Sequence, residues 1–236
     1  MSRDVRKHYN KIFKQLITEK GFKQKKDLFY KLVNDQILQT VYLQINSYGH
    51  SFTINIGILP LCSGLEYEDE YTFRLGHLLK GYDYSWEYGL YNSLDEESLV
   101  KDAFLALEEK VFPIFKRITN YEEYFNHIPD IEEAIYGSRR DNNSSMIWVS
   151  LITYNYDNAV LILEKLENQN REAAEANKVL YTKEDEYNIY LKKINDELSE
   201  LVSLRIAVQK RDSTFLESKL RQNEEISRKL LGMLGL

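Results

Sequence analysis

Cysteine and the helix-breaking residues are scarce in this chain of 236 residues, which has 1 Cys, 3 Pro and 10 Gly. The single Cys62 cannot form an internal disulfide, and it has no neighbouring cysteine with which to build a zinc site. A chain without disulfides is typical of a reducing compartment. We therefore expect a cytoplasmic protein, long enough to fold on its hydrophobic core alone.

Long apolar runs and an excess of positive charge are also missing. A run of about eighteen apolar residues occurs nowhere, and residues 1–20 carry charges throughout instead of the apolar stretch of a signal peptide. We expect neither secretion nor a membrane partner. The net charge of −6 argues against nucleic-acid binding, which clustered Lys and Arg drive. Residues 1–31 are locally basic, with ten Lys and Arg against three Asp and Glu.

The short motifs of common catalytic and nucleotide sites are absent as well. The sequence has no HxH, HExxH or CxxC for a metal, no GxSxG for a nucleophile, and no GxxxxGK[ST] or GxGxxG for a nucleotide. The four histidines are scattered, at His8, His50, His77 and His127. We expect no metal and no cofactor, and we favour a protein without enzymatic activity.

Two stretches, residues 38–46 and 52–58, alternate between apolar and polar residues with the period of a β-strand. The turn-like residues 47–50 join them and Pro60 ends the second, which predicts a β-hairpin. The residues expected to face the core are Val41, Leu43, Ile45, Phe52, Ile54, Ile56 and Ile58.

Further strands are predicted around this hairpin. Residues 28–33 form a short strand that ends at the turn signal Asn34-Asp35. Residues 71–79 form another strand, or a strand that breaks into a turn at Gly76. Aromatic residues alternate from Tyr82 to Tyr91, which predicts an edge strand with aromatic side chains on one side.

Helical patterns flank the predicted sheet. Apolar residues recur at three- and four-residue steps in residues 5–17, and Gly21 is a typical stop after such a helix. Capping-box spacings at Ser93 and Thr119 predict two further helix starts, and Pro129 is expected to end the second helix.

The last hundred residues are almost free of helix breakers. After Pro129 the sequence has no proline, and its only glycines are Gly137, Gly232 and Gly235. Helices are expected at about residues 158–180, after Thr182 and after Thr214. We predict an α+β fold: residues 1–130 with an N-terminal helix, an antiparallel twisted sheet of four to five strands and flanking helices, and residues 131–236 as an all-α helical hairpin or bundle.

Several short motifs follow one another in an order that resembles a known family. They are Gly21-Phe22, Phe29, Tyr42-Leu43-Gln44, the run from Phe52 to Gly57, the run from Phe73 to Leu78, and Trp86. Over about residues 5–130 the chain resembles the bacterial family catalogued as domain of unknown function 4304. Members of that family often have paired tryptophans where this chain has Ser85-Trp86. The resemblance implies an α+β domain without a settled activity.

The predicted sheet carries one cluster of residues that could form a binding site. Alternation places Arg74 on the face opposite its neighbours, where a guanidinium could bind a carboxylate or phosphate in bidentate fashion. His77 and Trp86 lie nearby in sequence, and Gln44 and Asn55 could add amide contacts if their strands pair.

A purely structural role for these residues is the alternative. Arg74 would then pair with Glu66, Glu68 or Glu70, and the amides would satisfy neighbouring backbone groups. Tyrosine raises the same choice, because 18 Tyr against 2 Trp reflects either compositional bias or a recognition surface, where Tyr is enriched.

Three hypotheses about function follow. We favour a protein-interaction module, immunity-like or regulatory, that uses a sheet face and an aromatic edge with Tyr84 and Trp86. The second is a small-ligand binder or enzyme with a site around Arg74 and His77. The third is a homodimer formed through the heptad stripe of residues 187–208.

Overall fold

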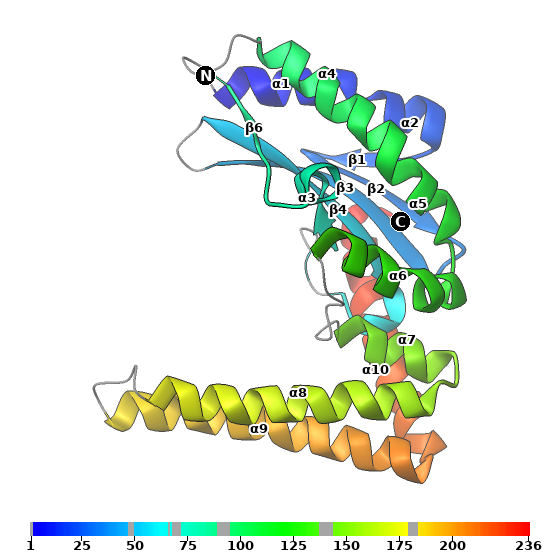
Figure 1. Cartoon of the computed structure of the whole chain (residues 1–236). Coiled ribbons are helices and arrows are strands. Elements are labelled where there is room, and N and C mark those ends of the chain that lie inside the picture. The colour runs from blue at the N-terminus through cyan, green and yellow to red at the C-terminus, as the bar shows by residue number, and fades with distance from the viewer. Residues whose placement is uncertain are drawn as a thin grey trace.

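The computed structural model packs helices on both faces of one antiparallel sheet and extends a helical hairpin away from them (Figure 1). It describes residues 2–46, 50–65, 67, 72–88, 95–136, 144–178 and 184–236. The predicted α+β class, with its N-terminal helix and its helical C-terminal part, is confirmed.

The strands that the structure describes form a six-stranded sheet in the order β1-β2-β3-β4-β5, with β6 also paired to β4. Their bounds are Lys23–Lys25 for β1, Leu28–Val33 for β2, Ile37–Ile45 for β3, Ser51–Pro60 for β4, Phe73–Arg74 for β5 and Trp86–Glu87 for β6. The predicted hairpin is β3 and β4, paired from Ile37 opposite Pro60 to Ile45 opposite Phe52. With the two-residue strands β5 and β6, the described sheet has more strands than the four or five expected.

The turn between β2 and β3 is set by two residues in the left-handed region. Asn34 and Asp35 have φ angles of 50° and 54°, and the Gln36 amide donates to the Val33 carbonyl at 3.0 Å. Asn and Asp tolerate positive φ better than other side chains. The predicted turn is therefore confirmed, and the strands that it joins pair from Val33 opposite Ile37 to Leu28 opposite Tyr42.

Helices that precede the strands in the sequence and helices that follow them together cover the first face of the sheet (Figure 1). They are α1 (Ser2–Ile12), α2 (Gln15–Lys20), α4 (Glu96–Ala106), the π-helical turn η2 (Leu107–Val111) and α5 (Phe112–Arg117). Tyr9 and Phe13 on the N-terminal helical segment meet Phe29 of β2, with ring centroids 5.6 and 6.3 Å away. Val41 and Leu43 are buried in this core, as predicted, and Gly21 ends α2 with φ 73°.

The second face is covered at one end by α10 (Ser213–Leu234), which returns to the sheet from the far end of the chain. The Lys23 ammonium donates to the Gly235 carbonyl at 2.8 Å, and the Tyr30 hydroxyl donates to the Leu234 carbonyl. The side chains of this second core include Leu28, Tyr30, Leu38, Leu59, Leu230, Leu231 and Leu234. The sheet therefore has two apolar faces at this end, although the alternation predicted one.

Further helices of the described chain are α6 (Tyr121–Tyr136), α7 (Ser144–Ile152), α8 (Tyr156–Asn177) and α9 (Glu184–Lys210). Helices α8 and α9 lie side by side as the predicted hairpin (Figure 1). The Arg205 guanidinium on α9 donates to both carboxylate oxygens of Glu167 on α8, at 2.6 and 3.2 Å, and Glu167 is buried. The heptad stripe on α9 thus packs against α8 of the same chain.

One predicted helix end is wrong, and one predicted pair of alternatives is decided by the structure. Helix α6 continues through Pro129, which we expected to end it. Ile128 and Ile135 are buried on either side of the proline, so packing retains the helix despite the missing N–H. For residues 71–79 we expected either a continuous strand or a strand that breaks at Gly76. The strand β5 stops at Arg74, close to the expected break, and the helix α3 (Leu75–Lys80) follows at once.

Some predicted boundaries lie within a helix or outside the described residues. The division expected at residue 130 falls inside α6. Ser93 and Thr182, expected as helix caps, and residues 47–49 of the predicted turn lie outside the described residues. Helix α4 instead begins after Asp95, whose carboxylate accepts from the Ser98 amide at 2.7 Å.

Ser227 fixes α10 to the end of β4. Its buried hydroxyl donates to the Leu61 carbonyl at 2.7 Å and accepts from the Leu65 amide at 2.8 Å. Ser227→Ala leaves both backbone groups buried without these bonds, and we expect a loss of about 1–3 kcal/mol in the free energy of unfolding. Urea denaturation measures it, with the exposed Ser218→Ala on the same helix as control. Equal midpoints for the two variants would contradict this role.

Candidate functional site

One half of the second sheet face is polar and is not part of the core that α10 closes. Gln44 of β3, Asn55 of β4 and Arg74 of β5 lie there, because Asn55 is opposite Arg74 in the strand register. The Asn55 amide nitrogen donates to the Gln44 side-chain oxygen at 3.0 Å. The structure therefore brings together three of the residues that alternation placed in a common site.

The cation of this cluster is paired within the chain. The Arg74 guanidinium donates to the Asp83 carboxylate, and about a quarter of the Arg74 side chain is exposed. The other oxygen of Asp83 lies 3.9 Å from Nδ1 of His77, which sits on α3 with its ring 5.2 Å from the Tyr136 ring. Glu66 and its acidic neighbours, expected as alternative partners of Arg74, lie outside the described residues.

Asp83 is the site residue that the sequence reasoning missed. It lies between Tyr82 and Tyr84, in a run whose alternating aromatic residues predicted an edge strand rather than a polar site. The only signal was its position nine residues after Arg74, and that spacing becomes meaningful once α3 is known to fold the chain back on β5.

A pocket of about 470 Å³ opens between these residues. Its lining includes Gln44, Ser51, Thr53, Arg74, Asp83 and Ser85. Thr53 Oγ1 and Asn55 Oδ1 are buried and have no hydrogen-bond partner among the described residues. Thr53 is 8 % exposed and lines the pocket, and Asn55 is 3 % exposed beneath it. Buried polar atoms in folded proteins nearly always have a partner, so this pocket offers hydrogen-bonding capacity to a bound group.

Trp86 does not belong to the exposed edge that we predicted. Its side chain is completely buried, stacked on Phe52 with a centroid distance of 5.6 Å and an interplanar angle of 11°. Its indole N–H donates to the Asp102 carboxylate at 2.9 Å. The expected role of Trp86 in direct partner contact is thus corrected to a role in the core, because strand β6 turns this side chain toward the first face.

The tyrosines beside Trp86 do reach the surface. Tyr82 is 59 % exposed, and Tyr84 is half-buried with the Lys80 ammonium 5.8 Å from its ring centroid. Desolvation by burial, with the Asp102 carboxylate adding to it, raises the pKa of Tyr84. Tyr91, the last aromatic of the predicted run, lies outside the described residues. Among the described residues of the predicted run, Tyr82 and Tyr84 therefore form the aromatic edge.

Neither a metal centre nor a membrane span emerges from the described ranges. No three His, Cys, Asp or Glu side chains in them gather closely enough to hold a metal ion. None of the helices described is both long and apolar enough to cross a bilayer.

Cys62 is a core residue in the short helix η1 (Leu61–Ser63) and is fully buried. Burial, with the Glu224 carboxylate adding to it, raises the pKa of the thiol. Because the thiolate is the reactive form, we expect the native protein at pH 8 to react with a disulfide reagent at least about 100-fold more slowly than the denatured protein. Absorbance of the released thiolate measures the rate, and similar rates in both states would show that Cys62 is accessible.

The segment of the chain that matches a known family covers the sheet and the first-face helices α2, α4 and α5. No curated protein and no solved structure matches the chain. Helices α6 to α10 lie beyond the matched segment, whereas Gln44, Asn55, Arg74, His77 and Asp83 lie within it. Residues 13–117 match the family described as Domain of unknown function (DUF4304), so this segment carries the family resemblance that the sequence motifs indicated.

Proposed function

We propose that this protein is a protein-binding module of the bacterial cytoplasm, immunity-like or regulatory, that receives an acidic segment of its partner on the open half of the second sheet face. The observation that carries the proposal is the pocket beside Arg74, in which Thr53 Oγ1 lacks a hydrogen-bond partner among the described residues. A partner carboxylate can accept from both groups, and charge-assisted bonds to a guanidinium are strong.

The contact between Arg74 and Asp83 suits such an exchange. Asp83 is about half exposed, so a partner carboxylate can compete for the guanidinium while Asp83 turns to water. Exposed ion pairs of this kind contribute little to stability, which keeps the cost of the exchange low.

The rim of the pocket supports a protein partner. The short helix α3 separates Tyr82 from Arg74 in the chain, and Tyr82 directly precedes Asp83. Tyrosine supplies a large contact area at a small cost in conformational entropy, and interfaces are enriched in it. The homodimer expected through α9 would require that helix to release α8, so we favour a different chain as the partner.

The test begins with capture of partners from the lysate of the native host, followed by titration of the purified pair. Arg74→Gln and Tyr82→Ser should each weaken binding at least about tenfold, which corresponds to about 1.4 kcal/mol. Arg171→Gln on α8 and Tyr154→Ser are matched controls, because both residues are exposed and neither lines the pocket. Unchanged affinity in the two test variants would exclude this face.

Binding of a small ligand is the second candidate, and the shared contact of Asp83 with Arg74 and His77 favours it. A carboxylate or phosphate compound would bind Arg74, and the His77 imidazole beside Asp83 would provide a further polar group at the site. A thermal-shift screen of small carboxylates and phosphates tests it. Stabilisation of the wild type that is lost in Arg74→Gln supports a ligand site, whereas no stabilisation by any compound leaves the protein partner as the better explanation.

A further inference from the structure

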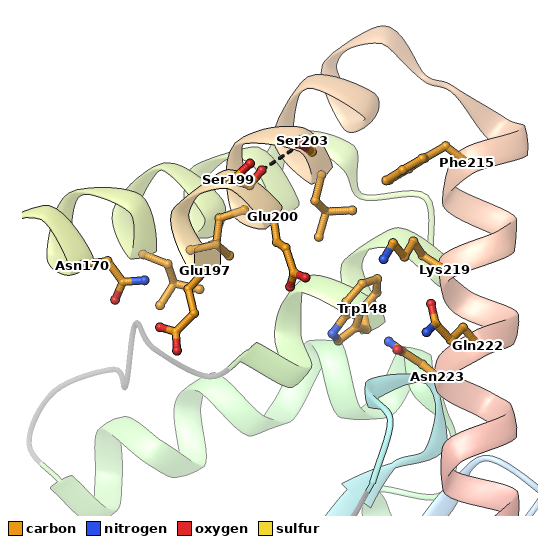
Figure 2. A pocket seen from close by; sticks show the side chains of 13 residues that line it. Trp148, Asn170, Glu197, Ser199, Glu200, Ser203, Phe215, Lys219, Gln222 and Asn223 are labelled. Atoms are coloured by element: carbon orange, nitrogen blue, oxygen red, sulfur yellow. Dashed lines mark hydrogen bonds between the residues drawn. The ribbon is translucent and has the colours of Figure 1, made fainter. Parts of the chain in front are cut away.

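A second cavity lies at the base of the helical hairpin, on elements that the sheet pocket does not share (Figure 2). It is open to solvent on one side, has a volume of about 660 Å³ and is lined by side chains of α7, α8, α9 and α10. This volume is in the range of sites for small molecules, which are about 300–1,000 Å³ and largely apolar with a few polar groups.

The interior of the cavity is aromatic and aliphatic. Trp148 of α7 and Phe215 of α10 are both half-buried, and Leu166, Leu201 and Leu204 complete the apolar wall. The two aromatic rings come from helices far apart in the sequence, so the cavity forms only when the hairpin and α10 have docked. Such a wall can hold the flat body of a ligand.

The charged groups of the cavity are placed asymmetrically. Glu200 on α9 extends toward Trp148 (Figure 2), and it has no hydrogen bond or ion pair to any part of the chain that the structure describes. Glu197 lies one turn earlier on the same wall and is 3.8 Å from Lys193. On the opposite wall, the Lys219 ammonium lies 5.9 Å from the centroid of the Phe215 ring.

We propose that this cavity binds a small organic cation with a flat body, an aryl amidinium or guanidinium, whose ring lies on Trp148 and whose charge pairs with Glu200. Trp has the strongest attraction for a cation among the aromatic residues. A planar amidinium-type group matches a carboxylate in bidentate fashion and is more weakly hydrated than an ammonium. Lys219 already lies over Phe215, which leaves Glu200 as the charge that faces the ligand.

Titration of the full-length protein with benzamidine and with benzamide tests the proposal, because the two compounds have nearly the same shape and differ in charge. We expect saturable binding of benzamidine that is at least about tenfold tighter than that of benzamide. Calorimetry measures both, and quenching of tryptophan fluorescence reports on Trp148, since Trp86 is completely buried.

Two variants should change the affinity for benzamidine in opposite directions. Glu200→Gln should weaken it about tenfold because the carboxylate is lost, and Lys219→Met should tighten it a few-fold because a repelling charge is removed. Both residues are on the surface of helices, so both variants should fold. Glu217→Gln is the matched control, since it makes the same substitution on an exposed site of α10 outside the cavity.

Three outcomes overturn the proposal. They are binding of benzamidine that does not saturate up to its solubility limit, equally tight binding of benzamide, and binding of benzamidine by Glu200→Gln that equals that of the wild type. Equal binding of the two compounds would identify an apolar cavity without selectivity for charge. The sheet pocket is not involved in any of these measurements, so their failure leaves the proposed protein-binding function untouched.

Discussion

Trp86→Ala is expected to lower the free energy of unfolding by about 3–5 kcal/mol, the usual cost of truncating a large buried aromatic residue. The substitution removes the ring that stacks on Phe52 and meets Tyr84 edge-on at 5.2 Å. It also removes the indole donor of the Asp102 carboxylate. Guanidinium denaturation followed by circular dichroism measures the loss.

Trp86→Phe separates the two contributions. It keeps an aromatic ring against Phe52 and removes only the hydrogen bond to Asp102, so its cost should be clearly smaller. If Trp86→Ala unfolded at the same denaturant concentration as the wild type, Trp86 would be an exposed edge residue, as the alternating aromatics alone suggested. The expected instability also means that Trp86 variants cannot be used to test partner binding.

Gly76→Ala is expected to lower the free energy of unfolding by about 3 kcal/mol, the upper end of the usual range for an overpacked site. A Cβ at this position would lie 2.0 Å from the Tyr84 carbonyl oxygen and 2.8 Å from the Tyr84 carbonyl carbon. Because these are backbone atoms, they cannot move aside as a flexible side chain could. Either α3 or the segment before β6 has to shift, and the contacts of Asp83 with Arg74 and His77 should loosen with it.

Gly232→Ala is the matched control for this substitution. Gly232 lies in α10, and a Cβ there would meet no atom within 4 Å. Alanine favours helix over glycine by about 1 kcal/mol, so this variant should be as stable as the wild type or more stable. Thermal unfolding of the pair measures both effects, and a Gly76→Ala protein as stable as Gly232→Ala would show that α3 does not pack closely on Tyr84.

The strands of the central hairpin could be predicted because their burial follows a local rule. Val41 and Leu43 alternate with polar residues in β3, and Ile54 and Ile56 do the same in β4, so the period of the pattern marks the core face. The turn at Asn34-Asp35 was equally predictable, since it depends on the conformational preference of two neighbouring residues.

Long-range contacts set the features that the sequence did not reveal. Leu38 and Leu59 are buried because α10 lies on them, and nothing in the local pattern indicates a helix more than 150 residues away. Strand β5 ends early because Gly76 allows α3 to approach the backbone of Tyr84. In both cases the burial of a residue depends on a partner distant in the chain, which overrides local propensity.

The candidate site could be predicted in part for the same reason. Alternation placed Gln44, Asn55 and Arg74 on one face, and strand pairing then made them neighbours. Trp86 was misplaced because the strand expected around it has only two residues, so its alternation carried little information. Asp83 lies in the site because α3 folds the chain back toward Arg74, and no periodic pattern in the sequence predicts that fold.

The way α10 closes the sheet has a consequence for the order in which the protein can be made. Tyr30 and Leu234, which are joined by a hydrogen bond, are 204 residues apart. At a synthesis rate of about 5–20 residues per second, the ribosome needs about 10–40 s to reach the second residue after the first. The last described strand, β6, ends at Glu87, so the strands are made long before α10 can cover Leu28, Leu38 and Leu59. The apolar side chains on this face of the sheet therefore stay exposed in the growing chain until α10 is made, late in synthesis.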